Sequence, residues 1–237
     1  MEEDKVERTF SEEFQIYLRP TWFIDSDSPT VAEFAQSTVG DASTDVEKGV
    51  RLYYAVRDFV RYNPYAIVPD PNAFRASSVL AARVGFCIQK AILLAAVTRA
   101  VAIPSRLGFA DVRNHLTTAR LRELMGTDVF TFHGYTESYL NGKWVKATPA
   151  FNRSLCERFK VRPLEFDGTR DSIFHPFDAE GRRHMEYLRD HGYFADFPLE
   201  RMEAAFREFY PHLFQKGVFW ARGDFEQEAS QEVERTL

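Results

Sequence analysis

The sequence has few of the features that mark several classes of protein. Its 237 residues include only two cysteines, Cys87 and Cys156, too few for a disulfide framework. No basic block stands out, and the formal net charge is −5, so nothing supports nucleic-acid binding. The longest apolar stretch, residues 91–97, is too short to span a membrane. Residues 1–8 are mainly charged and polar, unlike a signal peptide. We therefore expect a reduced, cytoplasmic protein that binds neither nucleic acid nor membrane.

The composition is that of an ordinary globular protein, with 45% hydrophobic and 27% charged residues. Phenylalanine is abundant, at 22 residues, and many of these lie in the second half of the chain. This length is enough for a full hydrophobic core. We expect a core region over residues 1–152 and a helical, loop-rich extension with a mobile tail over residues 153–237.

Local patterns predict several helices and strands. Alternation over residues 14–18 predicts an edge strand. Thr44 and Glu47 form a capping-box pattern that opens a helix to about residue 61. The mostly apolar run 87–102 predicts a central helix. In the second half of the chain, we expect helices near residues 182–190 and 199–214.

A β-hairpin is the clearest motif in the chain. Asn141-Gly142 is the strongest two-residue signal for a type I′ turn, and it lies between predicted strands 129–140 and 143–150. This turn sets a register that places Glu137 opposite Lys146, a favourable cross-strand charge pair. The same register places His133 opposite Ala150 and makes Thr148 its diagonal neighbour. Thr148 is then close enough for its hydroxyl to contact the imidazole.

Cys87 and His133 suggest nucleophilic chemistry. Cys87 lies at the start of the predicted helix, where the helix dipole and unpaired N–H groups favour a thiolate and lower a thiol pKa. His133 lies on a later strand, as a base for the thiol would. The alternative for Cys87 is a small buried hydrophobic residue, and Cys156 fits that description well. The alternative for His133 is a hydrogen-bonded strand histidine.

Four separated pieces of the sequence are similar to the core of the transglutaminase-like superfamily. They are residues 85–87, residues 98–106, His133 and the run 144–150, and the resemblance covers roughly residues 45–152. It implies a papain-like α+β core in which a cysteine-bearing helix packs on an antiparallel sheet that carries the histidine. Many members of the superfamily are proteases, peptide N-glycanases or uncharacterised hydrolases, and protein cross-linking is a minority activity.

The sequence departs from the family pattern at one position. The family usually has aspartate before the proline of the second hairpin strand, and this sequence has Thr148 there. A carboxylate would orient the histidine and stabilise its charged form, whereas threonine brings no charge. Asn152 could act as the orienting amide of papain-like enzymes, and Asp111 is a more remote possibility.

The resulting prediction is a cysteine-dependent acyl transfer on an amide, either hydrolysis or transamidation, with Cys87, His133, Thr148 and Asn152 as site residues. The substrate would be a peptide, a protein or another amide, and no cofactor or metal is expected. The backbone N–H of Cys87 is the natural oxyanion donor, and the second donor is to be sought among Tyr62, Asn63 and Tyr65.

Two other functions remain open. The first is a catalytically inactive binding or scaffold module that kept the fold, which the Thr148 departure favours. The second is a metal-dependent hydrolase built on His175, Asp178, His184 and Glu186, although their spacing fits no tight motif.

Overall fold

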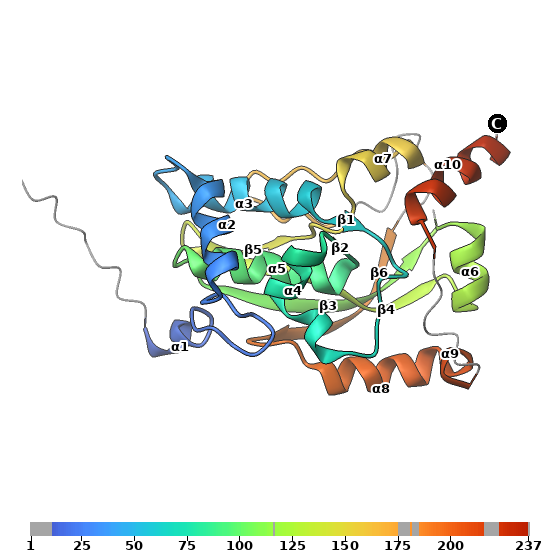
Figure 1. Ribbon diagram of the computed structural model, residues 1–237, viewed down its shortest axis with the longest axis horizontal. Coiled ribbons are helices and arrows are strands. Elements are labelled where there is room, and N and C mark those ends of the chain that lie inside the picture. Colours follow the sequence, from blue (N-terminus) through green and yellow to red (C-terminus); the bar gives the residue numbers. More distant parts are fainter. Residues whose placement is uncertain (1–10, 116, 175–180, 182–184, 216–222, 237) are drawn as a thin grey trace, which may run out of the picture.

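A single antiparallel sheet forms the centre of the molecule. The computed structural model describes residues 11–115, 117–174, 181, 185–215 and 223–236. The sheet has the strand order β5-β4-β3-β6, formed by β5 (Lys143–Ala147), β4 (Val129–Leu140), β3 (Ser105–Asn114) and β6 (Met185–Phe194). Helix α5 (Cys87–Ala100) packs against β4 and β3 (Figure 1). The expected α+β core, with a cysteine-bearing helix on an antiparallel sheet, is confirmed.

Three helices cover the side of α5 that faces away from the sheet. They are α2 (Pro29–Val39), α3 (Asp45–Phe59) and α4 (Ala76–Ala82), and each packs on α5. Helix α5 is therefore enclosed, and all of its residues from Ile88 to Arg99 are buried. A helix that is buried on every side needs apolar residues all round, which explains why the sequence shows a continuous apolar run here.

The predicted capping box at the start of α3 is present. Thr44 Oγ1 accepts a hydrogen bond from the backbone N–H of Glu47 at 3.1 Å. The Glu47 carboxylate in turn accepts one from the backbone N–H of Thr44 at 3.0 Å. These two bonds satisfy donors that the first turn leaves unpaired, so they fix where α3 begins.

The hairpin has the expected turn and register. Asn141 and Gly142 both have positive φ, 47° and 83°, as a type I′ turn requires. Glu137 pairs with Lys146, as predicted. The pairing stops at Ala147, however, because the backbone N–H of Thr148 donates to the carbonyl oxygen of Ser172 instead.

The prediction that β5 continues to residue 150 is therefore wrong. The ladder pairs expected for Tyr135 with Thr148, and for His133 with Ala150, do not form. The chain around Ser172 makes a parallel bridge to Ala147 and draws the strand away from β4.

Two other elements of the structure differ from those predicted from the sequence. Residues 12–15 form the short helix α1 (Glu12–Gln15), and the expected edge strand at 14–18 is absent. The predicted helix near 182–190 is wrong from Met185 onward, because β6 begins there and adds to the edge of β3. Side chains in β6 alternate only weakly between buried and exposed, which hides the strand pattern in the sequence.

Short elements complete the first part of the chain. Strand β1 (Arg61–Tyr62) pairs in parallel with β2 (Val84–Gly85), directly before α5. A 3₁₀ helix, η1 (Pro71–Phe74), lies between them in the sequence. Helix α6 (Ala119–Met125) connects β3 to β4.

The region after residue 152 contributes to the same core. It contains α7 (Arg153–Phe159), α8 (Leu199–Phe209), α9 (Pro211–Gln215) and α10 (Phe225–Thr236), in addition to β6. Met202 and Phe206 of α8 join the main hydrophobic cluster, and α10 packs on α7 (Figure 1). The last fifteen residues, expected as a mobile tail, include the helix α10.

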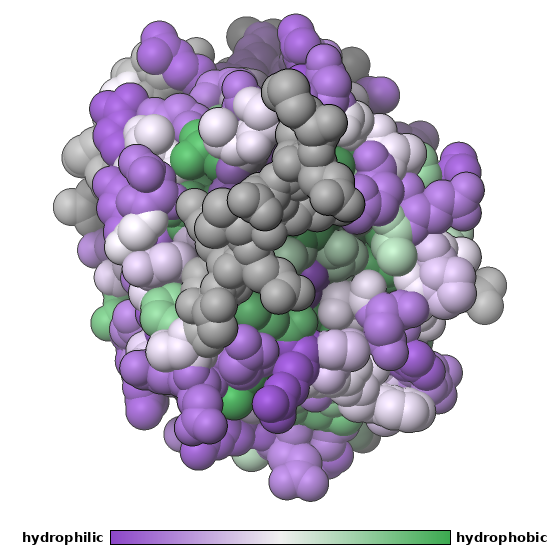
Figure 2. Space-filling model, turned by 90° about the vertical axis from the view of Figure 1, so that its left-hand side faces the viewer, coloured by the Kyte–Doolittle hydropathy of each residue, from purple (hydrophilic) through white to green (hydrophobic). Residues whose placement is uncertain are grey.

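The surface at the α1–α2 end of the molecule is mainly hydrophilic, with hydrophobic residues confined to small patches (Figure 2). Among the described residues, no helix combines the length and hydropathy needed to cross a bilayer.

Candidate active site

Cys87 is the first residue of α5, as predicted. Phe86 precedes the helix in an extended conformation, and its carbonyl oxygen accepts the first helical hydrogen bond, from the backbone N–H of Lys90. The β1–β2 pair fixes this start, because Asn63 donates its backbone N–H to the carbonyl oxygen of Gly85 at 2.9 Å. In that pair Tyr62 lies opposite Gly85, two residues before the cysteine.

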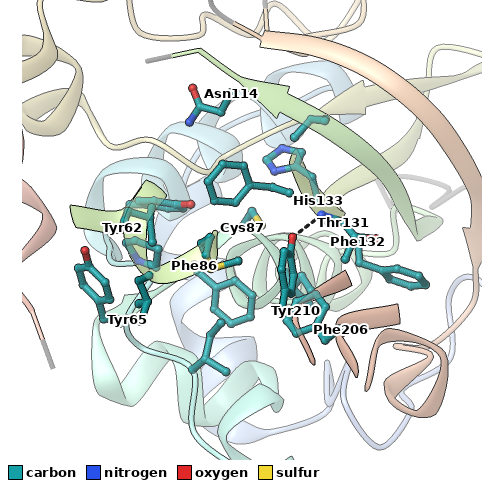
Figure 3. A pocket seen from close by; sticks show the side chains of 18 of the residues that line it. Tyr62, Tyr65, Phe86, Cys87, Asn114, Thr131, Phe132, His133, Phe206 and Tyr210 are labelled. Carbon is teal, nitrogen blue, oxygen red and sulfur yellow. Dashed lines mark hydrogen bonds between the residues drawn. The ribbon is translucent and has the colours of Figure 1, made fainter. Parts of the chain in front are cut away.

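The strand of His133 lies against the start of the cysteine-bearing helix because the residue after His133 is glycine. A Cβ atom on Gly134 would lie only 2.9 Å from the Cα of Ile88, so the backbone of β4 touches the first turn of α5. No other residue type fits at this contact without moving the strand or the helix. His133 and Cys87 consequently line the same pocket, together with Tyr62 and Tyr210 (Figure 3).

The Cys87 thiol is held as a neutral group, contrary to the expectation of a lowered pKa. Burial is the dominant influence, and it raises the pKa of the thiol to about 11. Hydrogen bonding from the backbone N–H groups of Gly134, Ile88 and Cys87 itself acts in the opposite direction and lowers the pKa, but not enough to offset burial. The helix start is present, but the surroundings do not stabilise a thiolate.

His133 is also neutral. It is 6% exposed, and burial lowers the pKa of its imidazole to about 4. Its Nε2 atom is buried and has no hydrogen-bond partner in the described part of the chain. Its ring packs against Phe174, with centroids 5.4 Å apart. Packing, not a polar partner, sets the orientation of this imidazole.

Thr148 does not orient His133 in this structure. It is 1% exposed, and its hydroxyl oxygen has no hydrogen-bond partner among the described residues. The contact expected from the extended hairpin fails because the strand turns toward Ser172 after Ala147.

Asn152 is placed in a structural role. Its Oδ1 accepts from the backbone N–H of Tyr62 at 2.9 Å. Its Nδ2 donates to the side chains of Ser154 at 2.7 Å and Glu226 at 2.8 Å. These bonds tie β1, α7 and α10 together, and none of them reaches His133. The expectation of an orienting amide gains no support from this geometry.

Asp111 supports the segment that precedes His133, through hydrogen bonds that go to other residues. It lies at a bulge of β3, between Ala110 and Val112. Its Oδ1 accepts from Thr131 Oγ1 at 2.6 Å and from the backbone N–H of Phe132 at 3.1 Å. Phe132 has a positive φ of 57°, a strained value for a residue with a bulky side chain. Asp111 therefore holds a strained residue next to the candidate base.

His191 completes this arrangement and was missed from the sequence. Its Nε2 lies 2.7 Å from Asp111 Oδ1, and its ring packs on Phe132 with centroids 4.4 Å apart. Burial acts to raise the pKa of Asp111, but hydrogen bonds from Thr131 and His191 outweigh it and lower the pKa. The sequence predicted a helix just before His191 and no strand there, so only the β3–β6 pairing brings His191 and Asp111 together.

The three candidates for a second oxyanion donor are distinguished by their hydrogen bonds. Asn63 uses its side chain for the backbone N–H of Tyr65 and the carbonyl oxygen of Gly223. Tyr65 donates its hydroxyl to Glu228 at 2.7 Å. Tyr62 lines the pocket of Cys87, and only burial and Cys87, with no hydrogen bond, shift the pKa of its hydroxyl.

No metal centre is evident in the described chain. His175, Asp178 and His184, three residues of the alternative metal site, lie outside the described residues. Within the described ranges, no group of three or more histidine, cysteine, aspartate or glutamate residues could hold a metal ion.

Comparison with known proteins identifies the fold. The profile of the Transglutaminase-like superfamily matches residues 32–149. A candidate cysteine protease from Cytophaga hutchinsonii is 20% identical over 59% of this chain and 43% of that chain, with a TM-score of 0.47. A candidate protease from Parabacteroides distasonis is 17% identical over 57% of this chain and 25% of that chain, with a TM-score of 0.37. No curated protein matches the chain.

The two solved structures are distant, and less than half of each is covered, so the assignment depends on the profile match. That match includes the helix of Cys87, the strand of His133 and the hairpin. The chain therefore belongs to the transglutaminase-like superfamily.

Proposed function

We propose that the protein is a cysteine-dependent acyl-transfer enzyme that cleaves an amide, with Cys87 as nucleophile and His133 as acid and base. The main support is geometric. A thiol at a helix start and an imidazole on the adjacent strand line one pocket, and the Gly134 backbone closes the gap between the two elements. Membership of the superfamily supports the same general type of thiol hydrolase or acyltransferase.

The reaction begins with attack by the Cys87 sulfur on the substrate carbonyl carbon. As the S–C bond forms, the thiol proton passes to the neutral His133. The C–N bond then breaks, and His133 returns this proton to the leaving amine. In the second half, His133 takes a proton from water, whose oxygen attacks the thioester. The S–C bond breaks, the acid leaves, and the proton returns to sulfur. An amine in place of water would give transamidation.

The developing oxyanion needs donors that are already in place. The backbone N–H of Cys87 lies in the first turn of α5, where N–H groups have no partner within the helix. The Tyr62 hydroxyl is the second donor in this proposal, because Asn63 and Tyr65 are engaged elsewhere. Burial raises the Tyr62 pKa well above its usual value, so the phenol keeps its proton.

The alternative is a binding module without catalysis. The observation that favours it is the lack of any polar partner for His133 Nε2, combined with threonine where the family usually has aspartate. Such a module would keep the pocket but would not form a thioester.

Acylation by p-nitrophenyl acetate tests the proposal. We expect a burst of p-nitrophenol and an acetyl group on Cys87, with Cys156 as an internal control, because Cys156 is buried and does not line the pocket. His133→Ala should slow acylation about 100-fold or more. Because burial lowers the His133 pKa to about 4, the base is neutral above that pH. The acylation rate should therefore not change between about pH 6 and 9, where the Cys87 thiol and the His133 imidazole are both neutral.

Two results would contradict the proposal. One is equally slow acetylation of Cys87 and Cys156. The other is a Cys87 rate that His133→Ala leaves unchanged. Tyr62→Phe tests the oxyanion donor separately, with an expected fall of about 10- to 1000-fold in the acylation rate and little change in KM.

A further inference from the structure

We infer that the pocket beside Cys87 binds an uncharged aliphatic side chain of leucine size on the acyl side of the substrate. This inference rests on the proposed acyl transfer and names the substrate class for it. None of the described residues that line the pocket is an aspartate, glutamate, lysine or arginine. The rest of the wall is mostly apolar, and it includes Phe86 before α5, Leu124 and Met125 of α6, Phe206 of α8 and Leu213 of α9.

The polar groups in the wall are nearly all occupied. Tyr210 donates its hydroxyl to the carbonyl oxygen of Val129 and accepts from the backbone N–H of Thr131 (Figure 3). Thr131 gives its own hydroxyl to Asp111, and Tyr65 gives its hydroxyl to Glu228. A polar substrate side chain that entered this space would lose its water and find no replacement, at a cost of about 1–3 kcal/mol or more for a charge.

The polar groups without partners lie where the reaction takes place. Among the described residues, His133 Nε2 has no hydrogen-bond partner. Only burial and the neighbouring Cys87 shift the pKa of the Tyr62 hydroxyl, with no contribution from a hydrogen bond. With the Cys87 thiol they lie at the polar end of the pocket. Apart from Asn114 and the hydrogen-bonded Tyr65, Thr131 and Tyr210, the rest of the lining is apolar (Figure 3). This division fits a substrate whose carbonyl meets the polar end while its side chain enters the apolar end.

The volume of the pocket limits the size of the substrate side chain that it can hold. Its cavity volume is about 80 Å³. This is roughly half of the ~150 Å³ apolar cavity that admits benzene. A branched aliphatic group fits this volume better than an indole ring does.

Covalent probes test the inference without a known substrate. N-acetyl chloromethyl ketones of leucine, tryptophan, glutamate and lysine would be reacted with the full chain. In each, the Cys87 sulfur displaces chloride and forms an S–C bond, and the thiol proton leaves with the chloride. Intact mass measurement gives the second-order rate for each probe. We expect the leucine probe to react at least tenfold faster than each of the other three.

A positive charge placed in the wall should weaken the preference for leucine over glutamate. Met125→Lys should raise the ratio of glutamate to leucine rates at least tenfold, and Met125→Leu should keep the leucine preference. Leu188→Lys is the matched control, since Leu188 is 44% exposed and outside the pocket. It should leave the wild-type ratio unchanged. Unfolding curves of each variant would show that it is folded.

The outcomes separate this inference from the proposed function. Equal rates for all four probes, or a ratio that Met125→Lys does not change, would overturn the inference while the ester assay still reports acylation at Cys87. Failure of acetylation in the ester assay would instead overturn the acyl-transfer proposal, whatever side chain the pocket prefers.

Discussion

Replacement of Lys90 by methionine should remove a pH-dependent loss of stability. Lys90 is on the first turn of α5 and is fully buried, with 0% exposure. Its amino group donates to the carbonyl oxygens of Arg57, at 2.8 Å, and Val60. A neutral amine has two N–H donors, which these two acceptors satisfy, whereas an ammonium has three. Burial accordingly lowers the pKa of Lys90 to about 7.

The sign and size of this effect of pH on stability follow from the protonation states of Lys90 in the folded and unfolded protein. The pKa of lysine in an unfolded chain is 10.5, so between pH 7 and 10.5 the unfolded chain binds a proton that the folded protein does not. Stability must therefore rise with pH across this window. At ~1.4 kcal/mol per pKa unit, the whole penalty at low pH is about 5 kcal/mol, and the part between pH 7 and 9 is about 2 kcal/mol.

Urea unfolding at pH 7, 8 and 9 would measure this effect. The difference in free energy of unfolding, Lys90→Met minus wild type, should be about 2 kcal/mol larger at pH 7 than at pH 9. The variant therefore gains most stability over wild type at pH 7. Lys143→Met is the matched control, because Lys143 is exposed, and its curve should stay parallel to that of wild type. If Lys90→Met is also parallel to wild type, then Lys90 is charged in the folded protein and the reasoning is refuted.

Three other changes test the contacts around His133. Gly134→Ala puts a methyl group 2.9 Å from the Cα of Ile88, and should cost about 1–3 kcal/mol in urea unfolding and slow ester acylation about 100-fold. Asp111→Asn removes the charge that supports the strained segment. Because the pKa of Asp111 is lowered in the folded protein, wild type should lose stability as pH falls below about 4, and the variant should lose less. Thr148→Asp should raise the pKa of His133, visible as a shift of the acid limb of the acylation profile to higher pH. An unchanged profile would show that position 148 does not interact with the imidazole.

The parts of the fold that depend on neighbouring residues could be predicted. The type I′ turn depends on Asn141 and Gly142 alone, and it determines the register that pairs Glu137 with Lys146. The capping box at Thr44 is equally local. The start of α5 at Cys87 could be placed because a long apolar run follows it.

The parts of the fold and of the site that depend on distant contacts could not be predicted from the sequence. The hydrogen bond between the backbones of Thr148 and Ser172 determines where β5 ends, and no local sequence pattern predicts this bond. The Asp111–His191 pair joins residues that lie 80 positions apart and forms only once β6 has added to the sheet. The depth at which Cys87 lies is likewise a property of the whole fold, so a local argument from the helix dipole predicted the wrong direction for its pKa.

The neutral state of the pair explains why a threonine is compatible with the site. The thiol pKa is raised to about 11 and the imidazole pKa is lowered to about 4, so burial favours the neutral pair over the thiolate–imidazolium pair at rest. A carboxylate at position 148 would serve to stabilise an imidazolium, and the resting site holds none. In the proposed reaction, the proton would then move as the S–C bond forms, when the proposed oxyanion donors begin to share the charge. An imidazolium formed at that moment is a strong acid, so it gives its proton readily to the leaving amine. Removal of the thiol proton, and not departure of the amine, should therefore limit the rate.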